Sequence, residues 1–436
     1  MKVFIFSYGT RGDVEPCVAL ARSMHASGHD ALVAGPAPFA GLAQTHAVPF
    51  APLDTGLTQL WDNPQTQEAA ATSTRGLPLR AFAEGFRRPA IPSIRQMLDN
   101  MWDAARGADL VVHHDCLLAT ASHYIAAKLR VPLVLSQMYP VLVPTRSFPV
   151  AVYRFPMQGR LPAALNRATY PAFQSMVRAV TSKDVEGWRQ QKLLLPRPRR
   201  RNGLLRRPDG GTVPVLNAFS RHILPPPPDW PQTVHTTGNW LLSAPPGWRP
   251  APELSDFLAA SEPPVYIGFG SMTSSVSPRI QRLVLEAVGR AGVRAVLAAA
   301  TDTGPASEDL PPGVILVNDV PHAWLFPRVA MVIHHGGLGT TAAASAAGRP
   351  QAIYPFMTDQ LFWADRMHRL GLTPAPVPVS RLTAAGLAST IRLVLGDPHM
   401  SQRARDLGDL LRAEDGAAVA TTVLEKIHKQ SLQSAA

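Results

Sequence analysis

The segment VIHHGGLGTTAAASAAGRP, residues 332–350, joins two adjacent histidines to a glycine turn and a run of alanines. The apolar residues that precede the turn predict a buried strand, on which His334 and His335 point to opposite faces. The glycines let the backbone approach a ligand closely, and Thr340 and Thr341 precede the helix AAASAAG. Because amides at the start of a helix bind anions, the segment predicts a phosphate site with a histidine at its lip.

A structural interpretation of the same segment stands beside this one. The histidines then form a buried structural pair, the glycines serve turn geometry, and a threonine is a plain N-cap. Zinc is disfavoured, because adjacent strand residues cannot chelate one ion together and no Cys/His spacing accompanies them.

Polar side chains also follow two apolar runs near the amino terminus. Asp13 follows the first run in TRGDVEP, and it is either a reactive carboxylate or the N-cap of a helix with Pro16 in its first turn. His113 and His114 end the run VVHHD, where one of them touches an acceptor or supports a base. The alternative is a strand-end turn in which Asp115 caps a helix.

Each half of the chain begins with a strand, a glycine turn and a helix, which is the βα unit of a parallel sheet. Further short apolar runs suit strands that helices cover on both faces. The sequence therefore predicts an α/β protein with two doubly wound, Rossmann-like domains that face each other across a cleft. The expected parts are an N-terminal domain over 1–240, a proline-rich linker over 241–252, a second domain over 253–415 and a final helical segment over 416–436.

Composition restricts the partners. The formal net charge is +11, part of it in the arginine-rich loop 196–208. This favours anionic partners, but no aromatic platform accompanies the arginines, so nucleic acid is not expected, while peripheral membrane contact through the loop stays open. The two cysteines suggest a reducing compartment, and neither a signal peptide nor an apolar run long enough to span a membrane stands out. We expect a cytoplasmic protein. The oligomeric state is not predicted.

Aromatic and methionine side chains between 60 and 102 either line an apolar acceptor pocket or form helix core. They are Trp61, Phe82, Phe86, Met97, Met101 and Trp102.

Five motifs in order resemble those of the inverting family 1 glycosyltransferases of the GT-B fold, above all the sterol and antibiotic-type branch. They read GTRGDVEPCVALA, VHTTGNWLL, PPVYIGFGSM, VPHAWLFP and VIHHGGLGTTAAASAAGRPQAIYPFMTDQLFWADRMHRLG. Both ends and the middle of the chain are covered. Coverage is weakest over roughly 55–235, where the family varies to fit its acceptor.

The resemblance implies a donor site in the C-terminal half. His335 aligns with the histidine that contacts the diphosphate, and the phosphate turn would consist of Gly337, Gly339, Thr340 and Thr341. Ser271 would reach a phosphate oxygen from the opposing turn, the backbone around Val320 would hold the nucleobase, and Asp359 and Gln360 would bind sugar hydroxyls. Plant relatives stack a tryptophan on the base where this chain has none, so the preferred base stays open. The Asp359–Gln360 pair suits intact sugar hydroxyls and mildly favours glucose.

The resemblance further places the catalytic base at Asp13, with Glu15 as the nearby alternative. The implied reaction moves a hexose from a UDP- or dTDP-sugar to a hydroxyl of a small apolar acceptor, such as a natural-product aglycone, sterol or lipid. No cofactor is expected, and without an evident carboxylate cluster for Mg²⁺ no metal is expected. A nucleotide-sugar epimerase on the same fold is the alternative. An oxidoreductase is disfavoured because GTRGD and GFGSM are not true G-x-G-x-x-G motifs, and a catalytically silent partner protein is disfavoured by the intact Asp13 and donor turn.

Overall fold

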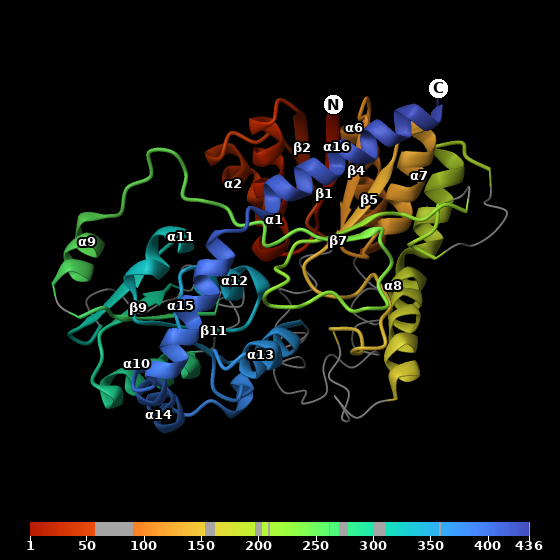
Figure 1. Ribbon diagram of the computed structural model, residues 1–436. Helices are drawn as coiled ribbons and strands as arrows, with labels where there is room; N and C mark the ends of the chain where they lie inside the picture. Colours follow the sequence, from red (N-terminus) through yellow and green to blue (C-terminus); the bar gives the residue numbers. More distant parts are fainter. Residues whose placement is uncertain are drawn as a thin grey trace. The chain divides into compact units, whose positions relative to one another are not determined.

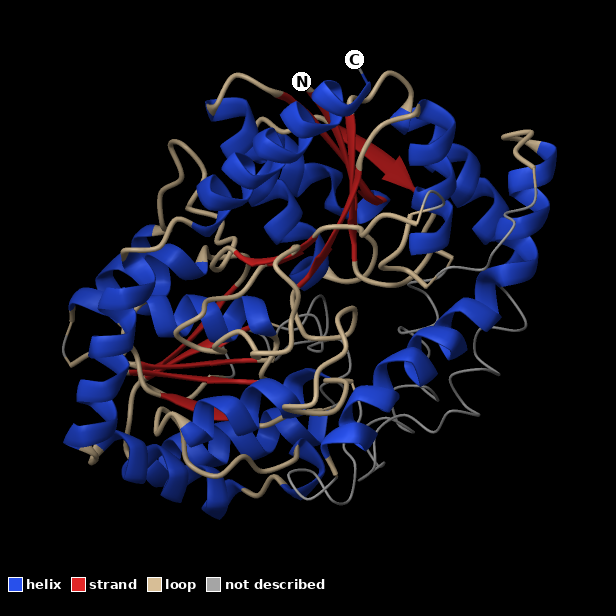
Figure 2. Ribbon diagram, turned by 45° about the vertical axis from the view of Figure 1, so that its right-hand side comes forward, coloured by secondary structure: helices blue, strands red, loops and turns tan. Residues whose placement is uncertain are grey.

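The computed structural model describes most of the chain. The described residues are 1–56, 90–152, 162–196, 203–207, 210–260, 262–269, 278–299, 310–356 and 359–435. They form two compact units. One contains the described residues up to Leu241 together with those from Asp415 onward, and the other contains the described residues of Leu242–Glu414. In each unit the strands lie between layers of helices (Figure 2).

The first unit is built on a parallel sheet with strand order β3-β2-β1-β4-β5-β6-β7. Its strands are β1 (Lys2–Phe6), β2 (Asp30–Pro36), β3 (Phe50–Leu53), β4 (Leu110–His114), β5 (Leu133–Gln137), β6 (Val215–Asn217) and β7 (Val234–Thr236). Its helices before the C-terminal segment are α1 (Arg11–Ala26), the 3₁₀ turn η1 (Ala37–Phe39), α2 (Ala40–Thr45), α6 (Ala90–Ala105), α7 (Ala119–Leu129) and α8 (Ala163–Gln191). The strand order reverses between β1 and β4, so the sheet is doubly wound.

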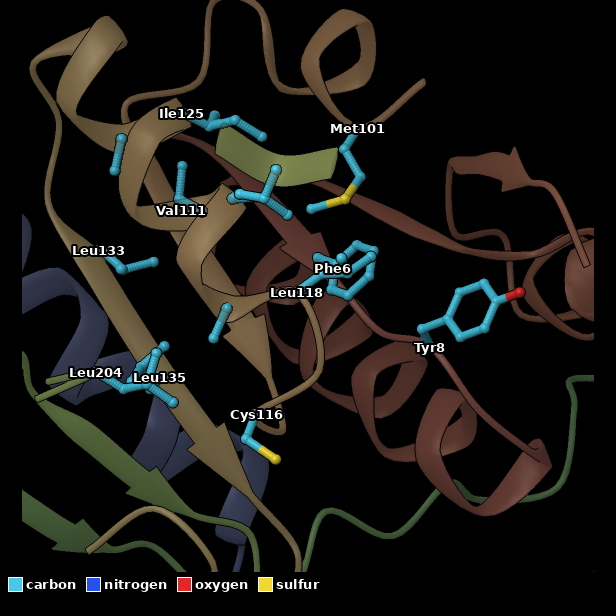
Figure 3. Packing of buried hydrophobic residues seen from close by; sticks show 14 of the residues in the cluster. Phe6, Tyr8, Met101, Val111, Cys116, Leu118, Ile125, Leu133, Leu135 and Leu204 are labelled. Carbon is cyan, nitrogen blue, oxygen red and sulfur yellow. The ribbon is translucent and has the colours of Figure 1, made fainter. Parts of the chain in front are cut away.

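Apolar residues on both faces keep β4 and β5 buried along their whole length. Helices cover both sides of a parallel sheet, so both faces of a central strand lose contact with water. Figure 3 shows one face, where Phe6 of β1 and Val111 of β4 pack with Met101 of α6 and Ile125 of α7. Each fully buried side chain of this kind contributes roughly 1.5–3 kcal/mol. These contacts hold α6 and α7 against the sheet and fix the carboxyl ends of β1 and β4.

The second unit repeats this plan with strand order β10-β9-β8-β11-β12, again parallel. Its strands are β8 (Val265–Gly268), β9 (Ala295–Ala298), β10 (Val314–Val317), β11 (Met331–His334) and β12 (Gln351–Ile353). Its helices are α9 (Pro252–Ala259), α10 (Pro278–Ala291), α11 (His322–Leu325), η4 (Phe326–Arg328), α12 (Leu338–Ala346), α13 (Asp359–Arg369), η5 (Val379–Arg381), α14 (Ala384–Leu395) and α15 (Pro398–Arg412). The predicted class of two doubly wound α/β domains is confirmed.

Helix α16 (Gly416–Ala435) belongs to the first unit although it ends the chain. It packs along α1, as Figure 1 shows by the blue helix beside the red one. The hydroxyl oxygens of Ser23 and Thr421 are 3.1 Å apart, and the Nε2 atom of His29 lies 2.7 Å from Glu425 Oε1. The last helix thus completes the helical layer over α1.

Candidate functional site

Each sheet reverses its strand order once, between β1 and β4 in the first unit and between β8 and β11 in the second. In doubly wound sheets, ligands bind beyond the carboxyl ends of the strands at this reversal. Phe6 of β1 pairs with His113 of β4, and Gly268 of β8 pairs with His334 of β11. The turns that carry Asp13 and His335 therefore lie at the two reversal points.

At the first reversal, Asp13 is the third residue of α1 and Thr10 is the N-cap. The alternative in which Asp13 is itself the N-cap is therefore wrong. The backbone N–H of Thr10 donates to Asp13 Oδ2 over 2.7 Å, and its hydroxyl donates to the same oxygen over 3.1 Å. A Cβ on Gly9, which has φ +146°, would lie 2.3 Å from that oxygen. Gly9 therefore leaves the space in which the carboxylate folds over the start of the helix.

Glu15, the alternative base, has a different setting on the same helix. Its Oε2 atom accepts from Arg11 Nε over 2.8 Å, and both side chains are partly exposed. This i,i+4 ion pair on the surface of α1 accounts for the presence of Glu15 without a catalytic role.

His113 is fully buried, and both of its ring nitrogens have partners inside the first unit. The Nε2 atom donates to the Leu117 carbonyl over 2.9 Å, so Nδ1 must accept from the Ser122 hydroxyl over 2.7 Å. The ring stacks on Phe6 with centroids 4.7 Å apart. Burial lowers the pKa of His113 to about 3, so the ring is neutral. In this arrangement neither ring nitrogen of His113 is available to an acceptor substrate.

His114 differs from its neighbour. Its Nδ1 atom lies 3.0 Å from the Ser136 hydroxyl, while Nε2 is buried with no hydrogen-bond partner among the described residues. Burial lowers its pKa to about 4, although nearby Asp115 acts in the opposite direction. Asp115, with φ +70°, forms the strand-end turn, and its Oδ2 accepts from the Tyr139 hydroxyl over 2.9 Å.

At the second reversal, β11 ends at His334 and α12 begins at Leu338. Gly337 is the N-cap, and among the described residues no side chain caps this helix. A Cβ on Gly337 would lie 2.5 Å from His335 Nε2, so the imidazole packs directly against the N-cap glycine. The first amides of α12 therefore have no side-chain cap among the described residues, and a histidine ring lies beside them.

The two rings of this doublet have different partners. His334 is fully buried and bonded through both nitrogens, whereas the Nδ1 atom of His335 has no partner among the described residues. His335 is 7% exposed, and its pKa is lowered to about 3 by burial, then by the nearby His334 and His322. His335 is therefore a neutral imidazole with an unsatisfied polar atom, which favours a ligand partner.

Thr340 and Thr341 lie inside the first turns of α12, not before the helix as predicted. Because the extended backbone of Gly337 makes it the N-cap, the helix begins at Leu338, four residues before the predicted start at Ala342. Thr341 is fully buried, and its hydroxyl donates to the Gly337 carbonyl over 2.9 Å. That bond supports the turn, and Thr340 is slightly less enclosed than Thr341.

Gln360, in the first turn of α13, lies next to the glycine turn. A Cβ on Gly336, which has φ +94°, would lie 3.0 Å from the Gln360 carbonyl oxygen. The side-chain Oε1 of Gln360 accepts from the backbone N–H of Phe356 over 2.8 Å. The structure thus brings Asp359 and Gln360, which start α13, into the neighbourhood of His335.

Val320 follows β10 and packs against a core cluster that includes Ala344 of α12. It also lines a cavity of about 480 Å³, together with Trp248 and the strand β10. Trp248 contacts Trp324 with ring centroids 5.2 Å apart. Trp324 belongs to the motif VPHAWLFP, but sequence reasoning did not connect Trp248, 76 positions earlier, with the predicted base segment.

Some predicted residues lie outside the described residues: Ser271 of the opposing turn, the central arginines 197–202 of the basic loop, and Trp61, Phe82 and Phe86. Met97 and Met101 are fully buried in the core around α6, and Trp102 packs against it. In the described ranges, no group of three or more His, Cys, Asp or Glu side chains is placed to hold a metal ion. Likewise, none of the described helices is long and apolar enough to cross a membrane.

Comparisons with known proteins connect these features to a family. A model for the C-terminal domain of erythromycin biosynthesis protein CIII-like proteins matches residues 282–425. The O-mycaminosyltylonolide 6-deoxyallosyltransferase of Streptomyces fradiae is 34% identical over 98% of this chain and 97% of its own length. A sterol 3-beta-glucosyltransferase of Emericella nidulans is 32% identical over 96% of this chain, which spans only 29% of that larger protein.

A solved structure extends the likeness to the fold. The spinosyn rhamnosyltransferase SpnG complexed with thymidine diphosphate matches 98% of this chain and 100% of its own chain, with a TM-score of 0.63 at 18% identity. The two doubly wound units and the near full-length relative agree with one another. The chain belongs to the family 1 glycosyltransferases of the GT-B fold.

Proposed function

We propose that this glycosyltransferase transfers a hexose, with inversion, from a UDP- or dTDP-sugar to a hydroxyl of a small apolar acceptor. The observation that carries the donor part is the pairing of His335, with its unsatisfied Nδ1, and the uncapped start of α12. His335 can donate a hydrogen bond, and the helix start offers its amides and dipole. Both stabilise a diphosphate, first in the bound nucleotide sugar and then in the leaving group.

The donor is held by the second unit in this proposal. Gly337, Gly339 and Thr340 line the phosphate turn, with Thr341 holding its geometry. Val320 and the cavity beside it, lined by Trp248, support a nucleobase site of mixed apolar and polar character. SpnG was solved with thymidine diphosphate, which supports a nucleoside diphosphate donor as a class.

Asp359 and Gln360 are proposed to bind the sugar hydroxyls. Oε1 of Gln360 accepts a backbone hydrogen bond from Phe356, and the side-chain amide also carries the Nε2 hydrogens that a sugar hydroxyl can accept. The sterol relatives are glucosyltransferases by name, which supports glucose, whereas the Streptomyces relative is named for a 6-deoxyallosyl group.

Asp13 is proposed as the general base. An acceptor hydroxyl must lose its proton as it attacks the anomeric carbon, and a carboxylate can take that proton. The two hydrogen bonds from Thr10 both go to Asp13 Oδ2 and hold the carboxylate over the start of α1, at the carboxyl end of the sheet. The relatives named for O-mycaminosyltylonolide and for sterols support a small apolar acceptor.

The experiment is a thermal-shift screen with UDP, dTDP, ADP and GDP, followed by turnover assays with UDP-glucose and dTDP-sugars on macrolide aglycones and sterols. A ligand at one hundred times its Kd raises stability by about 2.7 kcal/mol, so selective shifts with UDP or dTDP are expected. NMR of the product should show the inverted anomer. Sugar epimerisation without acceptor would support the epimerase instead, and no shift with any nucleotide would contradict the donor site.

A further inference from the structure

A chain of buried hydrogen bonds lies behind the glycine turn, on the side of His334. The Gly336 N–H donates to His334 Nδ1 over 3.0 Å, and His334 Nε2 lies 2.8 Å from Gln351 Oε1. Gln351 Nε2 donates to the Ser345 hydroxyl over 2.9 Å, and that hydroxyl donates to the Thr341 carbonyl over 2.8 Å. We call His334, Gln351 and Ser345 the turn relay.

The chemistry of its two ends fixes the direction of every bond in the turn relay. A backbone N–H can only donate, so Nδ1 of His334 accepts and the ring hydrogen must be on Nε2. The Nε2 hydrogen therefore goes to the Gln351 carbonyl, whose amide group then faces Ser345. The Ser345 hydrogen is left for the Thr341 carbonyl, which can only accept.

All three side chains of the turn relay are 2% exposed or less. They come from the end of β11, the last turn of α12 and the first residue of β12. At this depth each bond lacks competition from water, and a broken bond leaves a buried polar group without a partner. The relay thus clamps both ends of the 336–341 turn against the sheet.

We propose that His334, Gln351 and Ser345 are positioning residues that hold the 336–341 turn, with its helix amides and His335, in the conformation that binds the donor diphosphate. This rests on the proposed function of the turn. It also explains the doublet: His335 faces the ligand position beside Gly337, and its neighbour His334 fixes the turn from behind. The Gly336 N–H donates to His334 and is therefore not one of the amides that donate hydrogen bonds to the phosphate.

The test compares Gln351→Met, which keeps the side-chain volume but removes both relay bonds, and the milder Ser345→Ala. Calorimetry measures the Kd of UDP and dTDP and, separately, of uridine and thymidine. Misplaced amides should weaken the diphosphate roughly tenfold while the nucleoside changes little. Donor KM should rise in step, and Gln351→Glu, which keeps the acceptor for His334, should recover part of the loss.

Matched controls are Gln137→Met and Ser122→Ala, which remove buried hydrogen bonds in the first unit. They should lower Tm and leave the ratio of diphosphate to nucleoside affinity unchanged. If the relay variants lower Tm but keep that ratio, their role is structural only and the proposal fails. If the wild-type protein binds no nucleoside diphosphate, the proposed function fails instead.

Discussion

The protein carries two histidine doublets, His113–His114 at the end of β4 and His334–His335 at the end of β11. In both, the first histidine is fully buried and bonded through both nitrogens. The second has a buried nitrogen without a hydrogen-bond partner among the described residues, which is Nε2 in His114 and Nδ1 in His335. Burial leaves all four rings neutral, with pKa values of about 3 or 4.

The residues that come directly after each doublet make the difference between the two. After His114 comes Asp115, whose carboxylate would repel an anion, and α7 begins only at Ala119. After His335 come two glycines and the uncapped start of α12. In our proposal, a histidine at a strand end is therefore not a phosphate ligand by itself. Anion binding also requires a helix N-terminus beside the histidine and a turn whose sequence contains no carboxylate.

The largest effect should come from the first unit, at the turn after β1 and not at its histidine doublet. We expect Asp13→Asn to lower kcat by about 10² to 10⁴, because asparagine cannot take the acceptor proton. Asparagine can still accept from the Thr10 N–H, so Tm and nucleotide affinity should stay near wild type. Glu15→Gln is the matched control and should keep its kcat. Near-normal turnover by Asp13→Asn would leave Asp13 a helix-capping residue.

Alanine substitutions at the second histidines compare the doublets directly. His335→Ala should reduce kcat/KM for the donor about ten- to a hundredfold, since a hydrogen bond to a charged phosphate is worth roughly 1.5–3 kcal/mol. His114→Ala should leave UDP and dTDP affinity unchanged. Steady-state kinetics with varied donor and calorimetric nucleotide titrations measure both. Equal losses in the two variants would show that the doublets do not differ as we describe.

Acid should affect the two doublets alike. Their folded pKa values lie below the unfolded value near 6.5, so below that pH the unfolded chain binds more protons and stability falls. The loss is about 1.4 kcal/mol per pH unit for each ring, down to about pH 4. Above pH 6.5 these rings contribute no pH dependence. Urea unfolding at pH 7, 6 and 5 should show a shallower acid loss in His114→Gln and in His335→Gln, and an unchanged loss in either would refute its buried neutral state.

The smallest expected effect is that of EDTA on turnover. In our proposal the α12 amides and His335 carry the leaving-group charge, so excess EDTA should change the initial rate little. The control restores Mg²⁺ after chelation. Loss of activity with EDTA and recovery with Mg²⁺ would mean that the second doublet needs a metal partner for the diphosphate.

Much of the fold was predictable because buried parallel strands appear in the sequence as short, continuous apolar runs. The runs that end in His114 and His335 are apolar on both faces, and glycines mark the turns that lead into helices. Helix starts were predicted less well. Asp13 proved to be the third residue of α1, and Thr340 proved to lie inside α12, because local backbone conformation at Thr10 and Gly337 sets the start.

The sequence by itself determined the doubly wound class, the family, and which turns carry Asp13 and His335, since residue type and spacing fix strands, turns and helix starts locally. Only the tertiary structure decided which histidine of each doublet is fully bonded. The partners of His334 include Gln351, which stands 17 positions away on another strand. The hydrophobic periodicity of a sequence indicates that a side chain is buried. It does not indicate which residue the side chain contacts, because the contacts depend on strand order and register. The turn relay and the contrast between His114 and His335 therefore came from the fold.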